Sequence, residues 1–142
     1  MKFFYKIICI FLMLNCINIA IAENNYFNEG KKLFEKKDFK SAKFKFEQDI
    51  VFNPKSEKSY LYLAKIFKEN NKINLEERNL KTVLVLNPKN EEALYNLASL
   101  HLQKSNFKEA KKLMDTLELI CVNFCNEAEK IKVQAENSLS NK

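Results

Sequence analysis

The sequence has few of the residues that make tight turns and few of those that make active sites. It has one glycine, two prolines, one histidine and no tryptophan among 142 residues. A β-rich fold of this size needs more turn residues, so the composition favours helices. A single glycine excludes a glycine-rich phosphate loop, and a Ser–His–acid triad would have to use His101. We therefore expect an all-α protein that is not an enzyme and has no catalytic, metal or cofactor site.

The charge is basic but spread along the chain. The net charge is +6, and without Lys2 and Lys6 the chain has 22 basic residues against 18 acidic ones. Lysines and glutamates alternate, with no basic block of the kind that marks a nucleic-acid-binding arm. The chain is 46% hydrophobic and 30% charged, which is too apolar for disorder. We expect one globular domain with a solvated helical surface and no nucleic-acid partner.

The first 22 residues have the three parts of a secretory signal peptide. Lys2 and Lys6 give a positive start, residues 7–14 form an apolar run, and two alanines end at Ala22. Cleavage would then fall before Glu23. Abundant Lys, Asn, Ile and Phe are typical of an AT-rich genome, most simply that of a bacterium, so we expect a periplasmic or secreted protein.

Two alternatives to cleavage remain at this segment. A retained membrane anchor is one, although the apolar run is short for a span and Asn15 and Asn18 interrupt it. A lipid anchor on Cys16 is the other, although the residues at 13–15 are larger than those that normally precede a lipidated cysteine. Cleavage would leave no stable membrane span.

Two stretches, 26–54 and 60–88, repeat each other with a period of 34 residues. The matching pairs are Tyr26/Tyr60, Gly30/Ala64, Leu33/Phe67, Ala42/Glu76, Phe46/Leu80 and Pro54/Pro88. A fainter third copy contains Leu94, Ala98, His101, Ala110 and Met114. Apolar residues at helical spacing, separated by short polar breaks, predict two antiparallel helices in each copy.

The junctions at 53–56 and 87–90 predict where helices end and begin. Each contains an Asn-Pro-Lys sequence, and proline cannot continue a helix because it lacks the N–H. Ser56 and Asn90 follow these prolines and can accept hydrogen bonds from the free amides of the next helix.

This pattern resembles the tetratricopeptide repeat (TPR), over about residues 24–122. The resemblance implies an α-solenoid of three antiparallel helix pairs, A and B, with a terminal capping helix. The expected boundaries are repeats at about 23–56, 57–90 and 91–124, a cap at about 125–138 and a frayed tail at 139–142. In this family small residues let helices A and B approach closely. Here Glu76 and Asp49 stand at two positions that usually hold a small residue, which predicts looser helix packing around them.

The resemblance also implies a function, which is to bind a protein or peptide in a concave groove lined by the A helices. The groove positions carried over from the family are Phe27, Asn28, Lys31, Lys58, Tyr62, Lys65, Tyr95, Asn96 and Ser99. Aromatic rings beside lysines and asparagines suit an acidic peptide. The alternative is a mixed solvated face with Phe27 and Tyr62 partly packed. These two also occupy positions where the chaperone-binding TPR subclass holds a carboxylate with Lys and Asn, which argues against that specialisation here.

Two other functional classes compete with groove binding. A structural subunit could assemble end-on, as a homo-oligomer or in an envelope complex, through the open face of the first repeat. A redox-linked protein could use Cys121 and Cys125, although a redox pair usually has two intervening residues rather than three.

Cys121 and Cys125 would be the only cysteines of the mature chain. In an oxidising compartment two cysteines this close predict a disulfide. Two free, buried thiols are the alternative, and a zinc site would need four ligands. The one histidine, His101, occupies a helix A position filled by Leu33 and Phe67 in the other copies, so we expect it to be packed with a local hydrogen bond.

Overall fold

The computed structural model of the protein describes residues 25–140. The predicted signal peptide, its cleavage point between Ala22 and Glu23 and the alternative anchor at Cys16 lie outside these residues. Seven helices make up the described part, joined by short connections: α2 (Tyr26–Glu35), α3 (Phe39–Phe52), α4 (Glu57–Glu69), α5 (Ile73–Leu86), α6 (Glu91–Gln103), α7 (Phe107–Glu118) and α8 (Cys125–Ser140).

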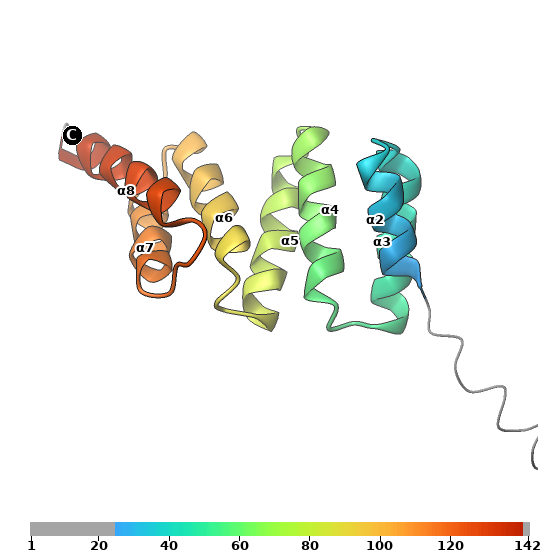
Figure 1. Cartoon of the computed structure of the whole chain (residues 1–142). Helices are drawn as coiled ribbons and strands as arrows, with labels where there is room; N and C mark the ends of the chain where they lie inside the picture. The colour runs from blue at the N-terminus through green and yellow to red at the C-terminus, as the bar shows by residue number, and fades with distance from the viewer. Residues whose placement is uncertain (1–24, 141–142) are drawn as a thin grey trace, which may run out of the picture.

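The helices form three antiparallel pairs, α2/α3, α4/α5 and α6/α7, stacked in chain order and followed by α8 (Figure 1). Each pair packs internally, and the second helix of one pair packs against the first helix of the next. The expectation of an all-α solenoid with three helix pairs and a capping helix is confirmed. None of these helices is both long and apolar enough to cross a membrane.

The pair-to-pair junctions behave as predicted in one case and differ in the other. Asn90 caps α6, because its side-chain oxygen accepts a hydrogen bond from the Ala93 amide at 2.9 Å. Ser56 precedes α4 but does not cap it through its side chain, so that expectation is wrong. Its hydroxyl instead donates to the Ser59 hydroxyl at 3.1 Å, and Ser59 in turn donates to the buried carboxylate of Asp49.

The turns within the pairs share one backbone conformation. Lys37, Asn71 and Ser105, spaced 34 residues apart, have φ angles of 61°, 53° and 56°. The residue after each donates its N–H to the carbonyl five positions earlier, at 3.0, 2.8 and 2.8 Å. This is the helix-ending pattern that glycine usually serves, since only glycine adopts positive φ without steric cost.

The small residues lie where the helices of a pair approach each other. Ala42, Ala64, Ala98 and Ala110 are buried, and so is Gly30. A Cβ added to Gly30 would lie 2.8 Å from the ring of Phe46, so this position has no room for a side chain. The glycine is therefore needed for packing.

The last helix extends further than expected and closes the stack. It reaches Ser140 rather than Ser138, so Leu139 and Ser140 are helical. Ala128, Ile131 and Ala135 are buried on one face, where α8 packs against α7 and also reaches α6. It occupies the place that the first helix of a fourth pair would take.

Candidate functional site

The first helices of the pairs, together with α8, form a surface that we call the A-helix surface (α2, α4, α6 and α8). The structure places the nine predicted groove residues on three of these helices. Phe27, Asn28 and Lys31 lie on α2, Lys58, Tyr62 and Lys65 on α4, and Tyr95, Asn96 and Ser99 on α6.

Two of the predicted aromatic residues belong to a cluster of rings. Tyr62 lies 5.0 Å from Phe46, 5.1 Å from Phe34 and 5.6 Å from Phe27, measured between ring centroids. Both Phe27 and Tyr62 are half-buried. Their rings thus help to join the first two pairs, and only part of each is left to contact a ligand.

The lysines of the A-helix surface differ in how far they are engaged. The Nζ of Lys65 lies 2.7 Å from a Glu92 carboxylate oxygen and 4.8 Å from the centre of the Tyr62 ring. Lys31 is exposed and has only a long contact of 3.9 Å with Glu35. Lys58 is also exposed. Of the three lysines in the predicted set, Lys31 and Lys58 are therefore more available to a partner than Lys65.

Both asparagines of the predicted set already form hydrogen bonds. The Asn96 amide donates to the Glu92 carbonyl at 2.8 Å, and its oxygen accepts from Lys68 at 3.2 Å. Asn28 donates to the side-chain oxygen of Asn25. Asn96 thus links α6 to α4, and a ligand could reach these groups only by competing with existing bonds.

A hollow of about 300 Å³ lies on the A-helix surface between α6 and α8. Its lining residues are all uncharged: Tyr95, Ser99, Leu102, Gln103, Ile131 and Gln134. Two of the predicted residues, Tyr95 and Ser99, are therefore brought together here. Ile131 and Gln134 were missed, because α8 was expected only to cover the stack. The signal that could have found them was the apolar period of residues 128–135, which places α8 beside α6 as a further A helix.

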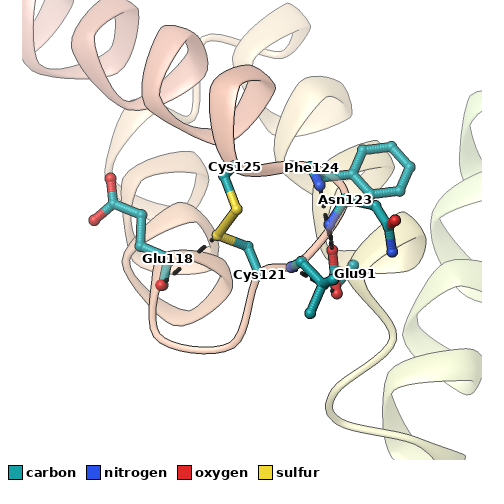
Figure 2. The surroundings of a disulfide bond; sticks show 7 residues. Glu91, Glu118, Cys121, Asn123, Phe124 and Cys125 are labelled. Atoms are coloured by element: carbon teal, nitrogen blue, oxygen red, sulfur yellow. Dashed lines mark hydrogen bonds between the residues drawn. A yellow bond between two sulfur atoms is a disulfide. The ribbon is translucent and has the colours of Figure 1, made fainter.

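A short loop between α7 and α8 lies at one end of this hollow. Cys121 and Cys125 form a disulfide in the structure, with their Cα atoms 5.4 Å apart (Figure 2). The bond encloses Val122, Asn123 and Phe124. The Phe124 ring lies 5.3 Å from that of Tyr95.

The enclosed loop binds a carboxylate of the protein itself. Three consecutive backbone N–H groups donate to Glu91 in the first turn of α6: Val122 at 3.0 Å, Asn123 at 2.9 Å and Phe124 at 3.3 Å (Figure 2). These bonds, that of Asn123 most of all, lower the pKa of Glu91 below its ordinary value. Glu91 thus ties the start of α6 to the start of α8.

His101 belongs to α6, but its side chain is buried among packed side chains inside the stack. It is buried, and one ring nitrogen lies 3.4 Å from the Asn106 amide nitrogen. Burial lowers its pKa, so the ring is neutral at pH 7. This geometry fits a packed histidine with a local hydrogen bond.

Comparison with known proteins identifies the fold but no close relative. No family model matches the chain, and no curated protein matches it either. Many solved structures match the fold, including the following three, each with probability 1.00. The TPR2B domain in the pHsp70 complex of yeast Sti1 has a TM-score of 0.70 and 16% identity, covering 80% of this chain and 94% of that one. The first TPR of Spaghetti (RPAP3), bound to the HSP90 peptide SRMEEVD, has a TM-score of 0.70 and 20% identity, covering 81% and 90%.

The third match is a bacterial protein. It is the Yersinia enterocolitica type III secretion chaperone SycD in complex with a peptide of the translocator YopD. Its TM-score is 0.71 and its identity 15%, covering 83% of this chain and 93% of that one. At these identities the likeness concerns the fold, and this chain therefore has the helical arrangement of a TPR domain.

Proposed function

We propose that this protein is a non-catalytic interaction module of the bacterial periplasm or cell envelope that binds a segment of a partner protein on its A-helix surface. The observation that carries the proposal is the hollow between α6 and α8, which lies on the same surface as the predicted groove residues and includes Tyr95 and Ser99. All three structural neighbours described above are complexes with a peptide or a protein ligand.

The charges of this surface favour a partner segment with acidic groups. Lys31 and Lys58 are exposed on adjacent A helices, α2 and α4. Carboxylates of a bound segment could pair with them at little desolvation cost, which favours fast association more than high affinity. Lys65 is already paired with Glu92, so we assign it to the scaffold.

The proposal is tested by photo-crosslinking in cells that produce the native protein. A benzophenone amino acid is placed at Lys58 on the A-helix surface or, as a control, at the exposed Lys112 on the second helix of the third pair. We expect a discrete adduct from position 58 that weakens when Lys31 is changed to Glu and persists when it is changed to Arg. Adducts from position 112 alone would contradict binding on the A-helix surface.

A second function is favoured by a separate observation, the exposed apolar residues of α3. The exposed fraction is 59% for Phe44, 73% for Val51 and 61% for Phe52. Such residues on the outer part of the first repeat fit assembly through that end, with another copy or an envelope subunit. Light scattering on wild type and on a Phe44→Ser, Val51→Ser variant separates the two functions, because only assembly through α3 requires these side chains.

A further inference from the structure

The hollow between α6 and α8 differs chemically from the rest of the A-helix surface. Tyr95, Leu102 and Ile131 supply its apolar surface, and its polar lining residues, Ser99, Gln103 and Gln134, are all uncharged. A charged side chain entering it would lose hydration without gaining an opposite charge, which is costly. An apolar side chain would lose only unfavourable contact with water, while the two amides could bind the backbone of the same segment.

Its size fits a single large side chain. The hollow is open to solvent, and its volume of about 300 Å³ exceeds that of an engineered closed cavity that holds benzene, so one large side chain has room to enter. This volume is also near the lower limit of small-molecule pockets, about 300 Å³. One leucine or phenylalanine side chain of a partner therefore suits it better than a larger ligand.

The wall formed by α8 depends on the loop at its N-terminal end. The disulfide joins Cys125, the first residue of α8, to Cys121 in the first half of the α7–α8 connection, and the three enclosed N–H groups bind Glu91 of α6. All three N–H groups must point the same way to reach one carboxylate, and the small ring restricts the backbone to conformations that allow this. These are charge-assisted bonds, which are stronger than neutral ones.

The same loop contacts the hollow directly. The ring of Phe124, one of the three enclosed residues, packs against that of Tyr95 at a tilt of 31°, and Tyr95 lines the hollow. The middle of α8 is held separately, by buried Ala128 and Ile131 and by the ion pairs of Lys132 with α7. Loss of the disulfide should therefore disturb the hollow without releasing the whole helix.

From these contacts we propose that the hollow between α6 and α8 is an anchor pocket for one uncharged, apolar side chain of the partner segment, and that the Cys121–Cys125 loop keeps it in its binding shape. The inference rests on the proposed function, because it assigns a partner chemistry to that surface. A dithiol reductant would convert the disulfide to two thiols and itself become a cyclic disulfide, and the pocket would then lose affinity.

The experiment is an NMR titration of the mature protein with single-residue probes. The probes are the N-acetyl amides of leucine, phenylalanine, lysine and aspartate, and the readout is the backbone amide shifts of Ser99, Gln103 and Gln134. We expect the leucine and phenylalanine probes to bind at least fivefold more tightly than the two charged probes. Equal binding of all four, or no binding of any, would overturn the proposal.

Two sets of variants test the pocket and the loop separately. Ser99→Leu should fill the pocket and weaken the leucine probe at least fivefold. The matched control, Thr82→Leu, places the same side chain at a hollow on α5 and should leave binding unchanged. Dithiothreitol, the Cys121→Ser, Cys125→Ser variant and Glu91→Gln should each weaken the probe at least threefold, with the amide shifts of α2–α5 unchanged.

The outcome also distinguishes this inference from the proposed function. Unchanged probe affinity after reduction would overturn the role of the loop, and unchanged affinity in Ser99→Leu would overturn the pocket. Either result would leave the crosslink at position 58 intact if the protein binds its partner elsewhere on the A-helix surface.

Discussion

At the scale of single residues, Glu76 and Glu77 show how one helix can treat two neighbouring carboxylates in opposite ways. Glu76 faces the interior at a position where the repeat pattern has a small residue, and burial raises its pKa, with Lys68 opposing the change. Glu77 binds Lys104 at 2.7 Å and Lys81 at 2.6 Å, and these hydrogen bonds lower its pKa to about 2. In its ionised form, Glu76 therefore destabilises the folded protein, whereas ionised Glu77 stabilises it.

We predict that replacing each with glutamine changes stability in opposite directions. Glu76→Gln removes a buried charge and should raise the free energy of unfolding by about 0.5–2 kcal/mol at pH 7. Because its folded pKa is raised, this gain should disappear as pH falls through that pKa to below the unfolded value of 4.5. Glu77→Gln should instead lower stability at pH 7, with a difference from wild type that vanishes as pH falls from 4.5 to about 2.

Urea unfolding of both variants across this pH range measures the effect. Each variant is the control for the other, because they change the net charge equally and lie side by side on α5. Two shifts of the same sign at pH 7 would mean that net charge, and not the local surroundings, decides the result.

The sequence also predicts some residue environments better than others. Asn90 caps α6 as the sequence predicts. Ser56 does not cap α4, because its hydroxyl donates to Ser59, which in turn donates to the buried Asp49. Asp49 belongs to the preceding helix, so the competition depends on tertiary packing. A pattern within one junction cannot reveal it.

At the scale of the helices, the turns inside the pairs are the least favourable part of the backbone. Lys37 and Ser105 adopt a left-handed conformation that costs an ordinary residue roughly 1–2 kcal/mol. Asn71 occupies the same place in the second pair, and asparagine tolerates this conformation better. The short polar breaks in the sequence predicted these turns, but without glycine they gave no sign of positive φ.

We predict that Lys37→Gly and Ser105→Gly each stabilise the protein by about 1 kcal/mol, because glycine removes the steric cost of positive φ. Asn71→Gly should give a smaller gain. Lys112→Gly, in the exposed middle of α7, is the control and should cost about 1 kcal/mol. Thermal unfolding of the four variants gives the comparison, and a loss of stability in Lys37→Gly would show that its side chain contributes more than its backbone costs.

At the scale of the whole molecule, the repeat period predicted the order and pairing of the helices. It did so because prolines and small residues act locally, within a junction or a helix pair. The 34-residue repeat period could not predict the hollow between α6 and α8, because the cap helix lies beyond the third repeat and only its own apolar spacing at 128–135 indicates which face packs on the stack. Nor could it show that Lys65 forms an ion pair with Glu92, since this pair joins different repeats.

The stack also implies that a defect at one end is felt most strongly at that end, because each pair contacts only its neighbours. Ala128 is fully buried between α8 and the third pair, so Ala128→Asp would place an unpaired carboxylate there. We predict a loss of roughly 3–5 kcal/mol, as for an uncompensated buried charge. Hydrogen exchange should accelerate in α6 and α7 more than in α2 and α3.

The matched control for this last prediction is Lys130→Asp, which introduces the same side chain two residues away at an exposed position of α8. It should leave the exchange of every helix close to that of wild type. If Ala128→Asp instead accelerates exchange equally from α2 to α7, the three pairs unfold as one unit. Helix pairs at opposite ends of the stack would then be coupled as strongly as adjacent pairs. A partner bound at the α6–α8 hollow would stabilise the first pair as much as the third.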